Sequence, residues 1–268
     1  MKVVLFCGGE GMRLRGYSED VPKPMVTIGS RPVLWHVMKY YAHFGHKDFI
    51  LCLGYKANAI KNYFLEYEES VSNDFVFSQG GRKLEFMQRD IDDWNITFVD
   101  TGLRSTIADR LRKVEPYLQG EDMFLANYSD GLTNLYLPQM VQEFSKRDCH
   151  AAFLAVQPRA SSLDTVIADE GGCVRAIKSM TDANIWINGG YFVLRREIFQ
   201  YIQPGEELIY EPFRRLIADG KLWSHRCTGF WQCMDTFKDK QILDEFEASG
   251  SAPWSVWKNG PQVAGSVA

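Results

Sequence analysis

Short apolar runs alternate along the chain with stretches in which apolar residues recur every three or four positions. Residues 3–7 form a continuous apolar run bounded by glycine, which predicts a strand buried on both faces of a parallel sheet. Residues 32–44 have helical spacing and predict a helix. Further strands are predicted at 48–53, 95–100, 123–128 and 150–156, and further helices at 57–67, 104–117, 137–146, 210–218 and 239–247.

This rhythm predicts an α/β fold, a Rossmann-like, doubly wound, mixed but mostly parallel sheet flanked by helices. Residues 71–93 depart from it, because they are partly alternating around Gly80-Gly81 and predict an inserted β-hairpin. Short β pieces are also predicted around Gly171-Gly172 and at 185–194. We expect residues 1–258 to form one domain and the small residues of 259–268 to form a flexible tail.

Composition and charge limit the classes of protein to which this chain can belong. A chain of 268 residues with 46% apolar content can bury a full core. The net charge of −4, with both signs mixed along the chain, leaves no broad basic face, so we expect no nucleic acid partner. The first apolar run is too short for a signal sequence or membrane span, and the six cysteines lack CxxC pairs. We therefore expect a cytoplasmic protein with reduced thiols and no membrane partner.

The first strand is followed by a glycine-rich loop and then by two cations. Gly9-Glu-Gly11-Met-Arg-Leu14 has leucine at the third glycine of a dinucleotide motif, and a Walker A Gly-Lys-Ser/Thr is absent. The loop can still surround a phosphate with backbone N–H groups, with Arg13 gripping phosphate oxygens, or it can be a simple strand-ending turn. Pro22 and Pro24 restrict the backbone around Lys23, so its ammonium is delivered to one place. The pair of features favours a phosphate site.

Residues 8–14 read G-G-x-G-x-R-L and residues 22–25 read P-K-P-M. Other recognisable segments are Leu34-Trp-His36, Gly54-Tyr-Lys56, Val99-Asp-Thr-Gly102, Asp130-Gly131, Ile187-Asn-Gly-Gly-Tyr-Phe-Val193, Gly229-Phe-Trp-Gln-Cys-Met-Asp-Thr236 and Ala252-Pro-Trp254. In this combination, which covers residues 1–257, the chain resembles the sugar-phosphate nucleotidylyltransferases, most closely the glucose-1-phosphate cytidylyltransferases. The resemblance implies the nucleotide-diphospho-sugar transferase fold and a homo-oligomer, with residues 71–93 serving either as an interface or as a surface hairpin.

The resemblance also implies a reaction and its residues. An oxygen of a sugar 1-phosphate such as glucose 1-phosphate attacks the α-phosphorus of a nucleoside triphosphate, here CTP, and pyrophosphate leaves. Arg13 would hold the departing phosphates, Lys23 the α-phosphate or the incoming phosphate, and Asp130 and Asp235 the cofactor Mg²⁺. The implied nucleotide-binding residues are Gly8, Gly9, Glu10, Gly11, Met12, Arg13, Lys23, Thr101, Arg110, Ser129 and Asp130. The implied acceptor-binding residues are Lys178, Asn188, Gly189, Glu211 and Trp231, of which Trp231 could equally belong to the core.

The acceptor side departs from the family pattern. Relatives carry Glu-Lys-Pro before Asn-Gly-Gly, but here the lysine position falls on Met180 and only Lys178 is nearby. The family T-G-G-R is replaced at 107–110, and F-G-x-L-D at 161–164. The acceptor is therefore glucose 1-phosphate or a different phosphorylated or phosphonate compound. A nucleotide-binding regulatory protein without turnover is the alternative, although the retained Arg13, Lys23, Asp130 and Asp235 favour an enzyme.

Overall fold

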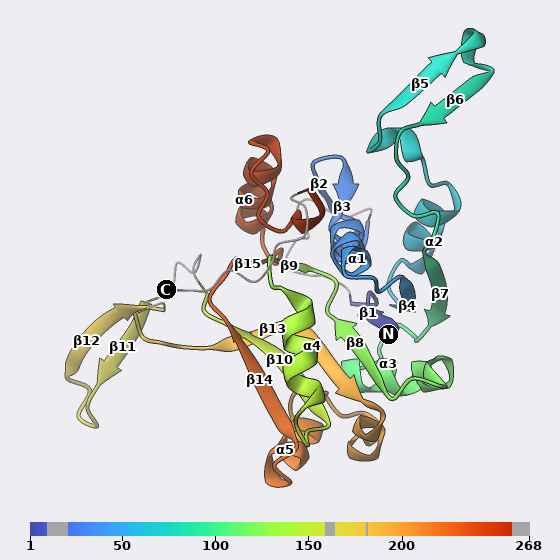
Figure 1. Ribbon diagram of the computed structural model, residues 1–268. Coiled ribbons are helices and arrows are strands. Elements are labelled where there is room, and N and C mark those ends of the chain that lie inside the picture. Colours follow the sequence, from blue (N-terminus) through green and yellow to red (C-terminus); the bar gives the residue numbers. More distant parts are fainter. Residues whose placement is uncertain (10–20, 159–163, 181, 259–268) are drawn as a thin grey trace.

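The computed structural model describes residues 1–9, 21–158, 164–180 and 182–258. Within these ranges, seven strands form a central sheet in the order β14-β10-β13-β8-β1-β4-β7 (Figure 1). β13 is antiparallel to both of its neighbours, and the other neighbouring pairs are parallel. The strands are β1 (Val3–Phe6), β4 (Asp48–Leu53), β7 (Asn95–Asp100), β8 (Met123–Asn127), β10 (Ala151–Val156), β13 (Ile187–Arg195) and β14 (Leu222–Cys227). The predicted mixed, mostly parallel sheet is confirmed.

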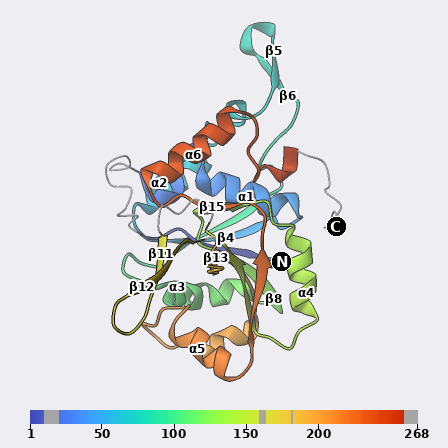
Figure 2. The same cartoon turned by 90° about the vertical axis from the view of Figure 1, so that its left-hand side faces the viewer.

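Helices cover both faces of this sheet. Figure 2 shows α1, α2 and α6 over one face, with α3 and α5 beneath the other. The helices are α1 (Val33–His43), α2 (Ala57–Leu65), α3 (Ile107–Val114), α4 (Leu137–Ser145), α5 (Glu211–Ala218) and α6 (Phe237–Ala248). In β1, Val3 and Leu5 pack into one core and Val4 and Phe6 into the other. A strand whose alternate residues enter two cores must be apolar throughout, as the first run is.

One strand of the central sheet was not predicted from the pattern. This strand is β14, because Leu222-Trp-Ser-His-Arg-Cys227 mixes polar and apolar residues as an edge strand does. The β structure predicted at 185–194 is confirmed by β13, which lies in the middle of the sheet. The predicted helix 104–117 is shorter, since α3 ends at Val114 and a 3-10 turn containing Pro116 follows.

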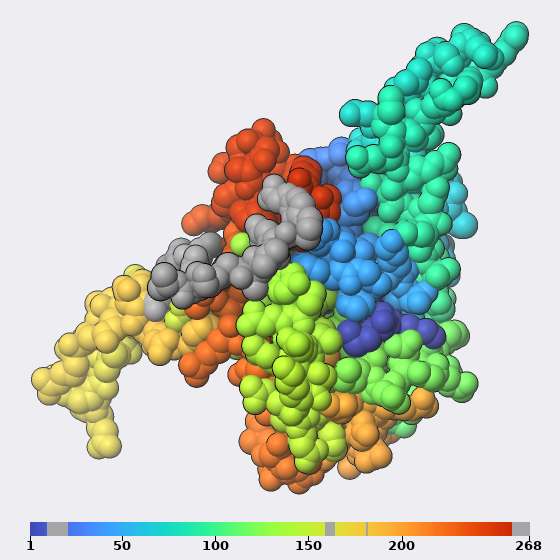
Figure 3. Space-filling model, in the orientation of Figure 1, coloured from blue at the N-terminus to red at the C-terminus, as the bar shows by residue number. Residues whose placement is uncertain are grey.

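Two hairpins project from the body (Figures 1 and 3). The first, β5 (Phe75–Ser78) with β6 (Lys83–Phe86), confirms the predicted insertion, and the second is β11 (Asp164–Ala168) with β12 (Val174–Ser179). Shorter ribbons pair β2 (Thr27–Ile28) with β3 (Arg31–Pro32) and β9 (Gly131–Thr133) with β15 (Trp231–Cys233). The proposed tail, residues 259–268, lies outside the described residues. No described helix is long and apolar enough to cross a membrane.

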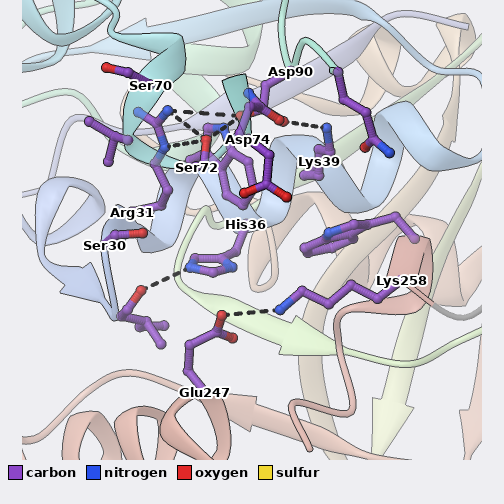
Figure 4. A pocket seen from close by; sticks show the side chains of 16 residues that line it. Ser30, Arg31, His36, Lys39, Ser70, Ser72, Asp74, Asp90, Glu247 and Lys258 are labelled. Carbon is purple, nitrogen blue, oxygen red and sulfur yellow. Dashed lines mark hydrogen bonds and ion pairs between the residues drawn. The ribbon is translucent and has the colours of Figure 1, made fainter. Parts of the chain in front are cut away.

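A buried carboxylate fastens the first hairpin to the body. Asp90 accepts hydrogen bonds from Lys39 Nζ at 2.8 Å and from the Ser72 hydroxyl (Figure 4). It also accepts one from the Tyr67 hydroxyl at 2.9 Å. Burial alone would raise the pKa of Asp90, but its hydrogen bonds and the charge of Lys39 outweigh burial and lower that pKa. The insertion is therefore anchored to α1 through a charged contact.

Two of the sequence segments noted above meet in the core around His36. Trp254 Nε1 donates to His36 Nδ1 at 3.3 Å, and the remaining ring nitrogen, Nε2, lies 3.1 Å from the carbonyl oxygen of Ile28. Because indole N–H can only donate, Nδ1 must be the acceptor, and Nε2 carries the proton that binds Ile28. His36 is therefore neutral, and it joins α1 to the C-terminal segment.

This arrangement generates a prediction on pH. Burial lowers the pKa of His36 from its ordinary 6.5 to about 4. The unfolded chain takes up a proton below pH 6.5 and the folded chain does not, so the free energy of unfolding falls between pH 6.5 and pH 4 by about 3 kcal/mol. Urea denaturation at a series of pH values, compared between wild type and His36→Gln, measures this loss. A His36 imidazole that titrates near pH 6.5 by NMR would contradict it.

Candidate active site

The two prolines fix Lys23 as the sequence predicted. Lys23 begins a 3-10 turn, Lys23–Met25, in which Met25 N donates to the Pro22 carbonyl at 2.8 Å. Pro24 and Met25 are buried and hold this turn against the core. The Lys23 backbone therefore has little freedom, and movement of its ammonium is confined to the side-chain torsions.

A short antiparallel ribbon brings Asp130 and Asp235 together. Asp130 directly precedes β9 and Asp235 follows β15, and the ribbon pairs Gly131 with Cys233. Met234 N continues the pairing by donating to the Asp130 carbonyl at 2.9 Å. The ribbon lies beside the central sheet in Figure 1. Residues far apart in the sequence thus meet at one end of a ribbon.

Lys23, Asp130 and Asp235 form one cluster. Lys23 Nζ lies 2.6 Å from Asp130 Oδ2 and 2.5 Å from Asp235 Oδ1. The side chains of Lys23, Asp130 and Asp235 are 14%, 24% and 37% exposed, so the cluster faces solvent from a partly buried position. One ammonium is therefore shared by two carboxylates, and the cluster keeps one net negative charge.

Burial and charge act in opposite directions on these groups. Burial alone would lower the pKa of Lys23, but attraction to Asp130 and Asp235 outweighs it and leaves that pKa above its ordinary value. Burial raises the pKa of Asp130, and the neighbouring Asp235 adds to the rise against the opposing charge of Lys23. Lys23 is consequently an ammonium at neutral pH.

Asp239 positions Asp235 and was missed in the sequence. Its Oδ2 accepts the backbone N–H groups of Asp235 at 3.1 Å and Thr236 at 2.8 Å, and Thr236 Oγ1 caps Asp239 N in return. Thr236-Phe-Lys-Asp239 is a capping box, a pattern readable from sequence. The start of α6 is thereby fixed next to the second carboxylate.

Three predicted nucleotide-binding residues support the end of β1 from within. The buried Arg110 donates to the Gly8 carbonyl at 3.1 Å and to Thr101 Oγ1 at 2.7 Å. Ser129 is buried, adopts φ of 63°, and donates from Oγ to the carbonyl of Phe6 at 2.8 Å. The side chains of Thr101, Arg110 and Ser129 thus bond to the protein itself, and Gly9 is the exposed neighbour. The predicted contacts of Glu10, Gly11, Met12 and Arg13 lie outside the described residues.

The acceptor-side candidates lie along β13 and beside it. Asn188 Nδ2 donates to the Tyr128 hydroxyl at 3.3 Å, which links β13 to the segment that ends in Asp130. Trp231 Nε1 donates to the Gly189 carbonyl at 2.9 Å and is partly buried, so it packs rather than standing free. Glu211 is the first residue of α5 and accepts Glu207 N at 3.3 Å.

A cavity of about 390 Å³ opens at this edge of the sheet. Its walls come from β10, β13, β14 and α5, and they include Asn188, Trp186 and Arg226 among mainly apolar side chains. Asn188, Ala155 and Arg226 are cross-strand partners and point to one face. The guanidinium of Arg226 lies 5.1 Å from the centre of the Trp186 ring.

Lys178 is not part of the cluster. It is exposed on β12, in the hairpin that projects from the body (Figure 1), and its carbonyl accepts Thr165 Oγ1 at 3.0 Å. Met180 is partly buried just beyond this strand. The structure therefore separates the nearest lysine of this segment from the three residues that it brings together.

A second cavity, of about 670 Å³, lies beside α1 (Figure 4). Its charged groups pair with one another: Lys39 with Asp90 at 2.8 Å, and Lys258 with Glu247 at 3.2 Å. Arg31 donates to the Glu68 carbonyl at 2.8 Å and stacks over Tyr67 at 4.3 Å. These groups fasten the insertion and the C-terminal segment to α1, so we do not take this cavity as the reaction site.

The donor set of the cluster fits Mg²⁺. Asp130 and Asp235 offer hard carboxylate oxygens that already converge on one cation, the Lys23 ammonium. No group of three or more His, Cys, Asp or Glu that could hold a metal exists within the described ranges. Two carboxylates suit Mg²⁺, which is usually held by one or two of them together with phosphate oxygens and water.

Comparisons with known proteins show that this chain is similar to nucleotidyl transferases. The family model described as nucleotidyl transferase matches residues 2–246. Glucose-1-phosphate cytidylyltransferases of Salmonella typhi and Salmonella typhimurium are each 36% identical over 262 residues, which are 96% of this chain and 100% of theirs. The crystal structure of HddC from Yersinia pseudotuberculosis has a TM-score of 0.67 at 18% identity, covering 91% of this chain and 98% of that one, and it shares the fold.

The two first glycines make a matched pair for testing the end of β1. A Cβ on Gly8 would lie 1.9 Å from Arg110 Nη1, whereas a Cβ on Gly9 would meet no atom within 4 Å. Gly8→Ala should therefore displace Arg110 and destabilise the protein by about 1–3 kcal/mol, while Gly9→Ala should leave stability nearly unchanged. Thermal unfolding of both variants measures the difference. Equal stability of the two variants would contradict this role of Arg110.

Proposed function

The chain belongs to the nucleotidyl transferase family and is a nucleotidyltransferase, and on this premise we propose that it uses CTP and a sugar 1-phosphate such as glucose 1-phosphate. The products are a CDP-sugar and pyrophosphate. The observation that supports this proposal most directly is the convergence of Lys23, Asp130 and Asp235, three residues that the family resemblance assigned to the reaction.

The reaction needs charge neutralisation and alignment more than covalent catalysis. A phosphate oxygen of the acceptor forms a bond to the α-phosphorus of CTP, and the bond from that phosphorus to the bridging oxygen breaks. We propose that Lys23 binds a non-bridging α-phosphate oxygen and that Arg13 binds the departing phosphates. Asp130 and Asp235 would hold Mg²⁺, which supplies charge neutralisation when it is bound.

The alternative is a nucleotide-binding protein without turnover. The shared ammonium favours an enzyme, since a site that only binds nucleotide has little need of two carboxylates beside the phosphates. We also propose that the protein forms a homo-oligomer, with support from the exposed Phe77 and Ile177 on the two projecting hairpins.

Pyrophosphate release tests the proposed reaction. The protein is incubated with each nucleoside triphosphate, Mg²⁺ and a panel of sugar 1-phosphates. We expect the CTP and glucose 1-phosphate pair to be active, and Lys23→Ala and Asp235→Asn to lower kcat/KM by about 10²–10³-fold. Lys221→Ala, which removes a partly exposed lysine paired with Asp148, is the control and should keep full activity. Nucleotide binding without pyrophosphate release for any pair of substrates would favour the non-catalytic alternative.

The acceptor phosphate needs a cation, because the family lysine position holds Met180. We propose that the Arg226 guanidinium is the cation that binds the acceptor phosphate, since Arg226 shares a sheet face and a cavity with Asn188. Lys178 on the projecting hairpin is the competing candidate.

The two candidates can be separated by steady-state kinetics. Loss of a charge-assisted contact of about 1.5–3 kcal/mol should raise the acceptor KM by about ten- to hundredfold in Arg226→Ala, with the CTP KM unchanged. Lys178→Ala serves as the matched comparison and should leave both values close to wild type. The reverse pattern would move the acceptor contact to Lys178. Improved use of glucose 1-phosphate by Met180→Lys would support a lost phosphate contact at Met180, and no change would implicate Lys178 or another group.

A further inference from the structure

We propose that the Lys23 ammonium keeps the metal position between Asp130 and Asp235 closed until a nucleotide arrives. Divalent metal then enters the site together with the triphosphate, and the nucleotide-free protein holds metal only weakly. This inference rests on the proposed function, because it takes a nucleoside triphosphate and a divalent cation as the natural ligands.

The distances make the two cations alternatives. Lys23 Nζ lies 2.6 Å and 2.5 Å from one oxygen of each carboxylate, so it fills space that a divalent ion would need if both of those oxygens were to hold it. Mg²⁺ binds carboxylate oxygens at about 2.0–2.1 Å. An ammonium and a divalent ion cannot share this space, since they would overlap and repel each other. Metal binding through both oxygens therefore requires Lys23 to leave.

Charge decides when Lys23 can leave. Among the residues that the structure describes, Asp130 and Asp235 are the charged partners of Lys23 at hydrogen-bond distance, and its side chain is 14% exposed. Departure would break both of these charge-assisted hydrogen bonds. A bound triphosphate offers phosphate oxygens as new partners, so the ammonium can change partners instead of losing them.

The backbone makes this exchange a side-chain movement alone. The 3-10 turn Lys23–Met25 is fixed by Pro24 and by the bond from Met25 N to the Pro22 carbonyl. The capping box at the start of α6 keeps Asp235 in place through Asp239. The carboxylates thus stay together whichever cation lies between them. Lys23 acts as a positioning residue in one state and as a phosphate ligand in the other.

Binding of Mn²⁺ to the nucleotide-free full-length chain tests the inference, with the electron paramagnetic resonance of free Mn²⁺ as the readout. Lys23→Met removes the charge and keeps most of the volume, so it should bind Mn²⁺ at least tenfold more tightly than wild type. Lys23→Arg keeps the charge and should stay weak. Adding Asp235→Asn to Lys23→Met should abolish the gain, and Lys221→Met, at an exposed pair with Asp148, should match wild type.

Equal Mn²⁺ affinity of wild type and Lys23→Met would overturn the inference, and so would a gain in Lys23→Arg as large as in Lys23→Met. Circular dichroism of each variant establishes that it is folded. The titration needs neither an acceptor nor turnover, so its failure is distinct from that of the proposed reaction. If the sugar phosphate panel is active and Lys23→Met leaves Mn²⁺ affinity unchanged, the proposed reaction is retained and the closed metal position is rejected. If the panel is inactive and Lys23→Met binds Mn²⁺ more tightly, the closed metal position is retained and the proposed reaction is rejected.

Discussion

One ammonium shared by two carboxylates is the contact on which the candidate active site depends. Lys23 reaches across 107 residues to Asp130 and across 212 residues to Asp235, with 2.6 Å and 2.5 Å between the charged atoms. The three side chains come from a 3-10 turn and from the two segments that flank one end of the β9-β15 ribbon. The cluster can form only when these separate segments are folded, so the fold and the candidate site are coupled through charge.

The surroundings of the cluster are built to keep backbone in place. Arg110 holds the end of β1 by its bond to the Gly8 carbonyl, and Ser129 adopts a left-handed conformation that turns the chain into Asp130. Such a conformation is uncommon for a residue other than glycine and is often found at functional sites. At the start of α6, Asp239 holds the backbone of Asp235 in place by accepting its N–H group. The charged groups can therefore change partners while the scaffold remains fixed.

The sequence predicted those features of the fold that depend on a local pattern of residues. Continuous apolar runs identified β1 and β4, and the prolines around Lys23 indicated a fixed ammonium. The family resemblance, rather than periodicity, brought Asp130 and Asp235 into one site. β14 was missed because an edge strand tolerates Ser224, His225 and Arg226, and the antiparallel course of β13 depends on pairing between distant segments. Only the structure shows that Arg110 is bonded to acceptors of the protein itself, since the spacing of residues in the sequence does not reveal which acceptors surround a buried guanidinium.

A crystal structure with Mn²⁺ and a non-hydrolysable CTP analogue tests the central claim most directly. The account predicts an anomalous Mn²⁺ peak between the Asp130 and Asp235 carboxylates, with the Lys23 ammonium moved onto a phosphate oxygen of the nucleotide. A Mn²⁺ peak away from these carboxylates, with Lys23 still between them at the distances found here, would contradict it.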